Sequence, residues 1–551
     1  MHNKLCPLRR RACGEQMRNA RLMALGRFFA RGNTHTNPPA RGHRAGRVFL
    51  SCLLLSGGAL GGLHAQRTQA AAPASVVARH TTTPYRPDQT DRAFLADLEH
   101  RTFLWFWDSA DPATGLVPDR YPSDQTQSSV ASIGFALTAY GIGADRGYIN
   151  RQQAVDRTLT TLRYLWKLPQ NDSPDKAAGF HGFFYHFLKR ENGLRLNPDI
   201  ELSSIDTALL MQGVLFTTSY YTHDTDAEAE IRDLAAKLFN RVDWRWMLRP
   251  DNRLSMGWSP EHGFLPNYWE GYNEGMMLYV MGLGSTTHPL DPTSWQAWIS
   301  TNKNRWGESY GQTFLNFAPL FGHQYTHAWI DFRGIRDEWS RSIGIDYFEN
   351  SRRAVYAQQG YATQNPGKWQ DYGPNIWGLT ASDGPAETTK VENGQQRKFM
   401  AYTARGVGRD YTLDDGTLAP TAAGGSVAFA PELAIPALRT MRDRYGDRIY
   451  GTYGFVDAFN PSYHDGKQAY WADDTYIGID QGPILLMVEN WRDGMVWNTM
   501  KDNPIICRGL FRAGFRGGWL TTRHTIVDHD DAVRLKQQQT QPQAAPQTHA
   551  G

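Results

Sequence analysis

Residues 258–290 read WSPEHGFLPNYWEGYNEGMMLYVMGLGSTTHPL, an aromatic loop that leads directly into an apolar helix. Apolar residues at helical spacing continue on both sides of this segment. Apolar stripes at helical spacing mark three predicted helices, in residues 94–106, 130–140 and 155–166. Further predicted helices cover residues 203–221, 226–241, 274–284, 292–302, 334–358, 431–445 and 480–492. Strand signals are short, as in residues 179–188, and do not alternate with helices as a parallel sheet requires. The pattern predicts an all-α toroid of helical hairpins, with short β-hairpins and long loops that form a cleft.

The loop before the predicted helix combines carboxylates with aromatic rings. Glu270 and Glu274 lie among Trp258, Phe264, Tyr268, Trp269 and Tyr272. Enzymes cleave glycosidic bonds with two carboxyl groups that flank the scissile oxygen, and sugar rings stack on aromatic faces. Carboxylates within an aromatic cleft are therefore typical of a site that binds and cleaves sugars.

The overall composition favours a neutral ligand. Aromatic residues make up 12% of the chain, and 58 Lys and Arg residues nearly balance 55 Asp and Glu residues. Proteins that bind nucleic acids normally carry a strong basic excess that is clustered on one surface. A formal charge of +3 over 551 residues argues against that class and favours an oligo- or polysaccharide.

The N-terminal region predicts export. An arginine-rich stretch precedes the apolar run 48–63, and Ala65 is a small residue suited to cleavage before Gln66. The run of about 16 residues is shorter than the roughly 20 apolar residues of a membrane span. We therefore expect residues 1–65 to be a signal region and the mature protein to be periplasmic or secreted, with no membrane span after processing.

The remaining chain predicts one large domain between two flexible ends. Residues 66–91 are expected to form a flexible leader, and the low-complexity residues 526–551 a disordered tail, while no linker interrupts residues 92–525. Cys507 is the one cysteine after residue 65, which excludes an internal disulfide and a cysteine metal site in the mature chain. Because no ligand cluster with recognised spacing is present, we expect neither a metal nor an organic cofactor. The oligomeric state stays open.

Seven segments match, in order, a known set of motifs. They are IELSSIDTALLMQGVL (200–215), YNEGMMLYVMGLGSTTHPL (272–290), HAWIDFRGI (327–335), WGLTASDGP (377–385), LAPTAAGGSVAFAPE (418–432), YGFVDAFNP (453–461) and IGIDQGPILLMVENWRDGMVW (477–497). Over residues 92–520 the chain resembles the glucoamylase-like family that includes glycoside hydrolase family 144. The resemblance implies an (α/α)6 barrel and hydrolysis of β-1,2-glucans with inversion, often in the Gram-negative periplasm. Related groups release sophorose from chain ends or transglycosylate, so the mode of action stays open.

Glu274 is the first candidate for the general acid, because it matches the catalytic Glu in the family's Tyr-x-Glu-x-Met motif. A structural alternative is that Asn273 caps the helix and Glu274 is a first-turn acid favoured by the helix dipole. That dipole would lower the pKa of Glu274, the wrong direction for an acid. Catalysis therefore requires burial beside Tyr272 and Trp269 to outweigh the dipole.

Three further acids are candidates for the site. The family match suggests Asp206 and Glu201 as water-activating or sugar-binding residues, although Ser203-x-x-Asp206 also fits a capping pattern that needs no catalysis. If Glu270 and Glu274 were both helical, their Cβ atoms would be about 6 Å apart, whereas an inverting pair holds its carboxyl groups roughly 6.5–9.5 Å apart. We therefore expect Glu270 to precede the helix and to bind a sugar hydroxyl.

The remaining candidates for substrate binding lie in loops. They are Trp269, Tyr272, Trp377, Asp383, Asp457 and Asp480, with Trp258 and Trp471 as further aromatic platforms. Any of the three aspartates is also a candidate base. The structural alternatives are that an aspartate turns its loop through an Asx motif and that a tryptophan packs in the core.

Other chemistries leave weaker signals. Residues 307–311 fit the pattern G-x-S-x-G but lack the preceding strand of a serine hydrolase. His181, Tyr185 and His186 are residue types that polysaccharide lyases use, but lyases act on acidic polymers, which favour a basic groove. We therefore expect an exported glycoside hydrolase that inverts at β-1,2-glucan linkages. The alternatives are a noncatalytic glycan-binding or transport-associated protein, and an exo-acting or transglycosylating enzyme on a related β-glucan.

Overall fold

The computed structural model describes residues 85–392, 394–466 and 468–523, and the described residues from Pro87 onward belong to one compact unit. The predicted signal region 1–65 and the predicted tail 526–551 lie outside the described residues, as does most of the predicted leader. Helix α2 (Gln89–Ser109) begins three residues before the predicted domain boundary. It begins there because Asp88 and Asp91 form a reciprocal capping box.

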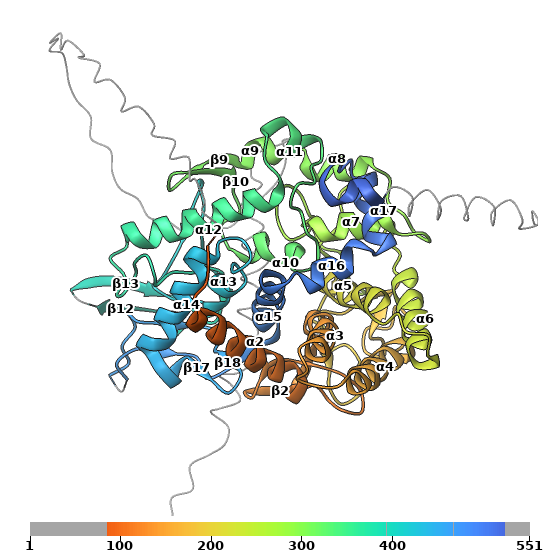
Figure 1. Cartoon of the computed structure of the whole chain (residues 1–551), viewed down its shortest axis with the longest axis horizontal. Coiled ribbons are helices and arrows are strands. Elements are labelled where there is room, and N and C mark those ends of the chain that lie inside the picture. Colours follow the sequence, from red (N-terminus) through yellow and green to blue (C-terminus); the bar gives the residue numbers. More distant parts are fainter. Residues whose placement is uncertain (1–84, 393, 467, 524–551) are drawn as a thin grey trace, which may run out of the picture. The chain divides into compact units, whose positions relative to one another are not determined.

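The longer helices of the described chain are of two kinds, which alternate in sequence except between α7 and α10 (Figure 1). The first kind is buried on nearly every side and comprises α3 (Val130–Asp145), α5 (Ser204–Tyr220), α7 (Met276–Gly284), α10 (Phe321–Trp329), α13 (Pro420–Gly424) and α15 (Gly478–Arg492). The second kind buries one stripe and comprises α2, α4 (Arg151–Lys167), α6 (Asp226–Arg241), α12 (Tyr347–Gln364) and α14 (Pro431–Tyr445). Short helices complete the set: α8 (Thr293–Ile299), α9 (Asn302–Arg305), α11 (Glu338–Ile343), α16 (Met495–Lys501) and α17 (Pro504–Arg512).

The buried helices pack directly on one another. Helix α15 contacts α3, α10 and α13, and α5 contacts α3 and α7. Figure 1 shows α4, α6, α12 and α14 towards the outside, with α5, α10 and α15 nearer the middle. Helices α3 and α5 approach each other closely, since a Cβ on Gly213 would lie 2.0 Å from the carbonyl oxygen of Gly134. The absence of side chains at these two positions lets the helix backbones touch.

Short antiparallel sheets join the N-terminal ends of three buried helices. Strands β2 (Asp124–Ser129), β6 (Leu202–Ser203) and β21 (Tyr476–Ile477) lead directly into α3, α5 and α15. One sheet has the order β21-β1-β2-β5, with β1 at Pro118–Tyr121 and β5 at Phe187–Lys189, and another the order β6-β7-β8, with β7 at Gly257–Ser259 and β8 at Gly263–Phe264. The other pairs are β3 (Gly179–Phe180) with β4 (Phe183–Phe184), β9 (Trp306–Ser309) with β10 (Gln312–Leu315), β11 (Ala381–Ser382) with β14 (Thr403–Ala404), β12 (Thr388–Glu392) with β13 (Gln395–Phe399), β15 (Gly406–Val407) with β16 (Thr412–Leu413), β17 (Tyr450–Gly451) with β18 (Gly454–Phe455), and β19 (Phe459–Asn460) with β20 (Trp471–Ala472).

The fold is helix-rich, as the apolar spacing predicted, but it is not purely helical because these sheets tie the helix ends together. The predicted helices 226–241 and 431–445 have the observed bounds. The predicted helix 334–358 is divided into α11 and α12, because Gly344 adopts a left-handed conformation with φ of 78°. The predicted helix 292–302 is likewise divided between α8 and α9.

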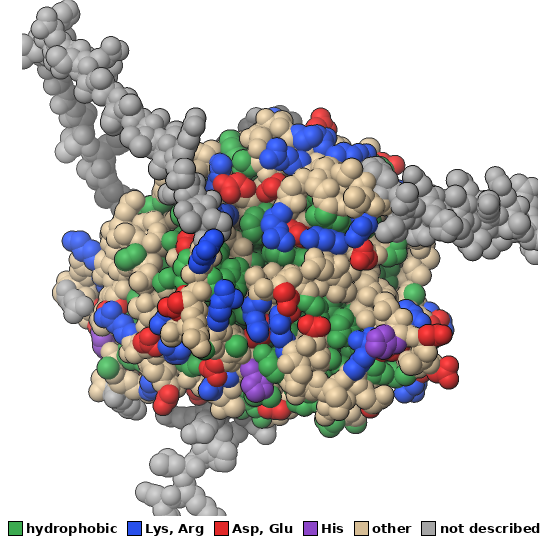
Figure 2. All heavy atoms as spheres, in the orientation of Figure 1, with side chains coloured by type: hydrophobic (Ala, Val, Ile, Leu, Met, Phe, Trp, Pro, Cys, Tyr) green, Lys and Arg blue, Asp and Glu red, His purple; other side chains and the backbone are tan. Residues whose placement is uncertain are grey.

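The surface agrees with a neutral ligand. Figure 2 shows Lys and Arg side chains interspersed with Asp and Glu side chains over the face in view. Within the described residues, every helix is too short or too polar to cross a bilayer.

A pair of glycine substitutions tests the contact between α3 and α5. Gly213→Ala should lower the thermal unfolding midpoint, because the new methyl group overlaps the α3 backbone and overpacking costs about 1–3 kcal/mol. Gly360→Ala on α12 is the matched control, since its Cβ would meet Tyr310 at an ordinary 3.4 Å. There alanine should stabilise by about 0.5–1 kcal/mol through helix propensity. Equal shifts of the two variants in circular dichroism melts would contradict this packing.

Candidate active site

The candidate acids gather at the N-terminal ends of buried helices. Asp206 lies in the first turn of α5, Asp480 lies in the first turn of α15, and Glu274 precedes α7 by two residues. Tyr325 on α10 connects them: burial, followed by the charges of Asp480, Glu274 and Asp206, holds the pKa of Tyr325 well above its ordinary value. Four segments that are far apart in sequence therefore meet at one site.

Glu274 is a buried carboxyl group with a raised pKa. The residue is 4% exposed, and its Oε2 has no hydrogen-bond partner among the described residues. Burial raises the pKa of Glu274 to about 8, against an opposing effect of Arg305. The N-cap of α7 is Gly275, and the Asn273 side chain accepts a hydrogen bond from its backbone N–H. Glu274 therefore precedes the helix rather than lying in its first turn, and burial dominates the dipole.

His186 bridges Glu201 and Asp206. Its Nδ1 lies 3.0 Å from Glu201 Oε1 and its Nε2 lies 3.4 Å from Asp206 Oδ1. Burial alone would lower the pKa of His186, but the carboxylates of Asp206 and Glu201 outweigh burial and raise this pKa to about 9. The imidazole is therefore a cation at neutral pH. The sequence indicated His186 only as a residue type that lyases use, because its contacts with residues 15 and 20 positions away depend on the tertiary fold.

Asp206 has both of the roles that its sequence pattern allows. Ser203 is the N-cap of α5, and its hydroxyl accepts from the backbone N–H of Asp206 at 3.2 Å. The same hydroxyl donates to Asp206 Oδ2 at 2.6 Å. Burial raises the pKa of Asp206, whereas His186 and Ser203 oppose the increase. Capping thus orients the carboxylate instead of removing it from the site.

A second acidic group contains two of the predicted aspartates. Arg120 Nη1 donates to Asp383 Oδ2 at 2.6 Å, and the backbone N–H of Asp383 donates to Asp457 Oδ2 at 2.7 Å. Burial and the neighbouring charge of Asp383 raise the pKa of Asp457 to about 6. Asp473, which sequence analysis did not single out, joins them, and burial holds its pKa well above the ordinary value.

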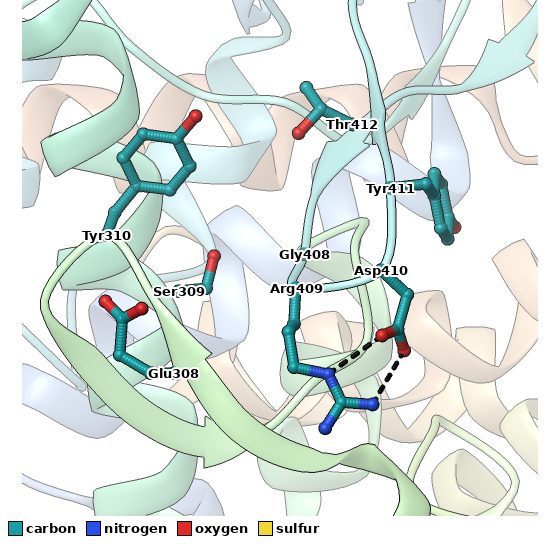
Figure 3. A pocket seen from close by; sticks show the side chains of 8 residues that line it. All are labelled: Glu308, Ser309, Tyr310, Gly408, Arg409, Asp410, Tyr411 and Thr412. Atoms are coloured by element: carbon teal, nitrogen blue, oxygen red, sulfur yellow. Dashed lines mark hydrogen bonds and ion pairs between the residues drawn. The ribbon is translucent and has the colours of Figure 1, made fainter. Parts of the chain in front are cut away.

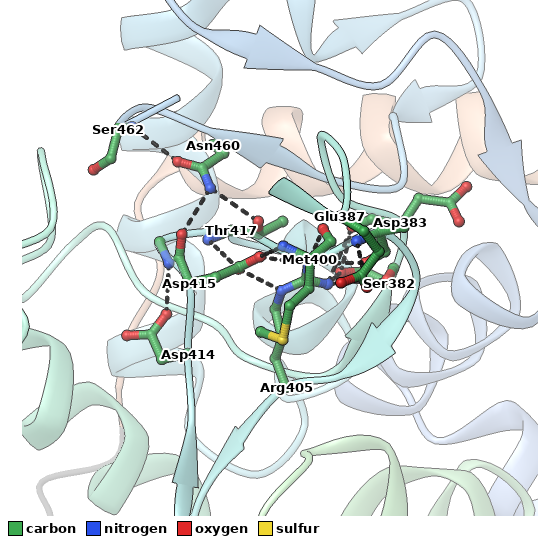
Figure 4. Close-up of polar contacts among 12 residues, drawn as sticks. Ser382, Asp383, Glu387, Met400, Arg405, Asp414, Asp415, Thr417, Asn460 and Ser462 are labelled. Carbon is green, nitrogen blue, oxygen red and sulfur yellow. Dashed lines mark hydrogen bonds and ion pairs between the residues drawn. The ribbon is translucent and has the colours of Figure 1, made fainter. Parts of the chain in front are cut away.

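A buried ion pair positions the loop that carries Asp383 (Figure 4). Arg405 and Asp415 are both fully buried and lie 2.6 Å apart. The Arg405 guanidinium also donates to the backbone carbonyls of Ser382, Asp383, Met400 and Ala401. These bonds hold both ends of the segment between β11 and β14 and thereby fix where Asp383 meets Arg120. No sequence motif indicated this pair.

Glu270 precedes α7, as predicted. Its carboxylate forms an ion pair with Arg253, and its backbone carbonyl accepts from Arg305 at 3.5 Å. Arg305 lies near both predicted glutamates, because the charges of Glu270 and Glu274 both act to raise its pKa against the effect of burial. Arg305 is a further site residue that sequence analysis missed.

The aromatic candidates divide by exposure. Tyr272 and Trp377 are fully buried and Trp269 is 2% exposed. These rings pack within the core of the described structure, in agreement with the structural alternative, and their role in substrate binding stays a prediction. Trp258 and Trp471 retain partial exposure. The physical reason is that aromatic residues at buried helices and strands supply much of the apolar packing.

Three groups of His, Asp and Glu side chains among the described residues bring possible ligand atoms close together, and two of these groups contain candidate site residues. Ligand atoms lie within 4.8 Å of one another in His186, Glu201 and Asp206 and in Asp383, Asp457 and Asp473. In the first group each imidazole nitrogen already faces a carboxylate at hydrogen-bond distance or slightly beyond. In the second group Arg120 supplies a positive charge directly to Asp383.

An open polar groove of 310 Å³ lies between two hairpin turns (Figure 3). Its lining comprises Glu308, Ser309, Tyr310, Gly408, Arg409, Asp410, Tyr411 and Thr412. Ser309, the serine of the G-x-S-x-G pattern, is the last residue of β9. The next element is β10 rather than a helix, which excludes the strand-turn-helix of a nucleophile elbow. Arg305 lies within electrostatic range of Asp410 and Tyr411 as well as of Glu274, so it connects this groove with the acids.

The residue types that suggested a lyase are separated in the structure. His181 stacks on Trp246 with ring centroids 4.4 Å apart, and its Nδ1 lies 3.8 Å from Asp243. Tyr185 is fully buried beneath Arg195. Of the three, His186 alone contacts the acids described above.

Comparison with known proteins identifies relatives of the whole domain. Residues 266–504 match the family model described as "Putative glucoamylase". An exo β-1,2-glucooligosaccharide sophorohydrolase from Parabacteroides distasonis is 27% identical over 451 residues, which are 76% of this chain and 58% of that protein. This chain therefore matches little more than half the length of that curated relative.

Solved structures with the same fold cover most of the domain. An endo-β-1,2-glucanase from Chitinophaga pinensis, solved with sophorotriose and glucose, is 28% identical with a TM-score of 0.68 over 78% of this chain and 99% of its own. A glucoamylase-like protein from Bacteroides uniformis is also 28% identical, with a TM-score of 0.68 over 79% of this chain and 100% of its own. The motif resemblance is thus confirmed at the level of a glucoamylase-like domain: residues 266–504 match its family model, and these solved structures resemble most of the chain.

Proposed function

We propose that this protein is a glycoside hydrolase that cleaves β-1,2-linked glucans by acid and base catalysis. The observation that carries the proposal is the burial of the Glu274 carboxyl group within electrostatic range of Asp206: the residue is 4% exposed, and burial raises its pKa to about 8, which favours the protonated form at neutral pH. Environments that separate the pKa values of neighbouring carboxyl groups distinguish an acid from a base. The relatives named as β-1,2-glucan enzymes support the choice of substrate.

In the proposed reaction, Glu274 donates its proton to the glycosidic oxygen as the bond to the anomeric carbon breaks. Asp206, oriented by Ser203 and His186, accepts a proton from the water that attacks the opposite face. Glu201 Oε2 is buried without a hydrogen-bond partner among the described residues and accepts from a sugar hydroxyl. The anomeric centre is inverted, and the two carboxyl groups exchange their protonation states.

We assign the three predicted aspartates to substrate binding. Asp383, Asp457 and Asp480 accept hydrogen bonds from glucose hydroxyls, and Arg120 offsets part of their mutual repulsion. We assign Glu270, whose backbone carbonyl accepts from Arg305, to substrate binding as well. The proposed substrate-binding set is therefore polar, with partly exposed Trp258 and Trp471 as the remaining aromatic contacts.

We further propose that the helices close an (α/α)6 barrel. Buried helices that alternate in sequence with amphipathic ones favour this arrangement, because each inner helix then follows an outer partner. The site would lie at the end of the barrel where the buried helices begin.

We also propose export of the protein. The arginine-rich stretch and the apolar run before Gln66 support a cleaved signal. In a Gram-negative host that expresses the full chain, N-terminal sequencing of the periplasmic protein should begin near Gln66. Full-length protein confined to the cytoplasm would contradict export without affecting the enzymatic proposal.

Product analysis tests the function directly. Incubation with linear and cyclic β-1,2-glucan should release shorter glucans, and proton NMR of fresh product should show the α-anomer, because water attacks opposite the leaving group. Sophorose alone would identify an exo mode, and a ladder of products an endo mode. Binding of the glucan without hydrolysis would instead support the noncatalytic alternative, and an initial β-anomer would contradict inversion.

Glu274→Gln is the matched control for that experiment. The amide preserves shape but has no transferable proton, so kcat should fall by about 10²- to 10⁴-fold while glucan binding persists. Near-normal turnover would move the acid to another carboxyl group.

The acid role also has a measurable effect on stability. Because the folded-state pKa of Glu274 is raised from 4.5 to about 8, the folded protein keeps a proton that the unfolded chain releases, and wild-type stability falls as pH rises through this interval. Glu274→Gln lacks this titration. Its stability relative to wild type should therefore increase by up to about 1.4 kcal/mol per pH unit between these values. A melting-temperature difference that does not change with pH would contradict burial of this carboxyl group.

A further inference from the structure

His186 is surrounded by acids from three different elements. Glu201 precedes β6, Asp206 lies on α5, and Asp119 lies on β1. The ring is held in plane by Phe187, which stacks on it with centroids 3.9 Å apart and an interplanar angle of 15°. Its backbone is fixed as well, because its N–H donates to the Glu201 carbonyl at 3.0 Å. The side chain therefore has little freedom to leave the acids.

With both carboxyl groups ionised, this geometry favours a proton on each ring nitrogen. A neutral imidazole has one N–H and one acceptor nitrogen, and an acceptor nitrogen would repel a facing carboxylate. With both nitrogens protonated, one N–H donates to Glu201 Oε1 at 3.0 Å and the other faces Asp206 Oδ1 at 3.4 Å. The ring thus places one positive charge between two negative ones.

We propose that His186 is a positioning residue that, as an imidazolium, keeps Asp206 ionised and oriented as the base while Glu274 stays protonated as the acid. This inference rests on the proposed function, because it assigns a role in the same reaction. His186 does not touch the glycosidic bond. It acts through Asp206, which Asp119 and Glu201 would otherwise favour in the protonated form.

The positive charge of His186 beside Asp206 predicts how the pH dependence of activity changes when the imidazole is removed. His186 lowers the pKa of Asp206 against the effects of burial, Glu201 and Asp119. Removal of the imidazolium should therefore raise the pKa of Asp206, so that the base becomes protonated at a higher pH. In the pH profile of kcat/KM, the acidic limb, where activity falls as the base becomes protonated, should therefore move to higher pH. A purely structural role would lower activity without moving that limb.

The charge state of His186 can be measured without substrate. In the full chain, the exchange rate of the imidazole C2 hydrogen with deuterium, followed by peptide mass spectrometry against pH, should inflect near 9 for His186. The ordinary inflection lies near 6.5. An inflection at or below that ordinary value would overturn the proposal, even if a His186 variant failed to fold.

His186→Gln tests the kinetic consequence. The amide retains one donor but no charge, so kcat on β-1,2-glucan should fall by about 10- to 100-fold, the range of a lost charged hydrogen bond, with a smaller change in KM. The acidic limb of the kcat/KM profile should move up by about one pH unit. Circular dichroism melts establish that the variant is folded.

His223→Gln provides the matched control. His223 Nδ1 also faces a glutamate, Glu228, at 3.6 Å, but its side chain is 61% exposed and lies beyond the C-terminal end of α5, a helix about 25 Å long. This variant should retain the wild-type profile.

The outcomes separate the two proposals. If the wild type is active but the acidic limb of the His186→Gln profile does not move, the proposed role of His186 is wrong and the proposed hydrolase activity stands. Wild type that releases no product from β-1,2-glucan overturns the proposed function instead.

Discussion

Desolvation of Glu274 is the constraint on which the proposed chemistry depends. A glutamate in water is ionised at neutral pH and has no proton to donate. Here α7 is apolar on every side, and the loop before it is enclosed by the neighbouring helices, so the carboxyl group is 4% exposed and its pKa is about 8. The same burial costs folding stability as pH rises. An acid of this kind therefore needs a large surrounding core, which the other buried helices provide.

A cation lies beside each of the two remaining groups of acids. His186 offsets Glu201 and Asp206, while Arg120 offsets Asp383 within the second acidic group. Arg120 lies on β1 and His186 immediately precedes β5, so both cations belong to the sheet β21-β1-β2-β5 or to its edge. The acids come from helix N-termini and loops. The short strands thus have a chemical role as well as a structural one. They bring cations to the ends of helices that would otherwise present uncompensated carboxylates to one another.

Much of the site was accessible from local sequence, but its connections were not. Glu274, Asp206 and Glu201 lie in motifs, and Glu270 could be placed before the helix from the spacing of glycine and asparagine. Asp473, Arg305 and Tyr325 carry no local signal. Their significance comes from electrostatic contact with residues that are distant in sequence, such as Arg305 with Glu274 and Tyr325 with Asp480.

By itself the sequence determined the helical periodicity, the lengths of helices such as 226–241, and the acids of the motifs, because these depend on residues within a few turns of one another. Only the tertiary structure decided which aromatic rings are buried and which cation faces which acid. Trp377 illustrates what the sequence leaves open, since the residue type alone does not determine whether a tryptophan packs in a core or faces a sugar. Burial, and with it the pKa of Glu274 and the charge of His186, is a property of the whole assembly of helices and is not encoded in any one segment.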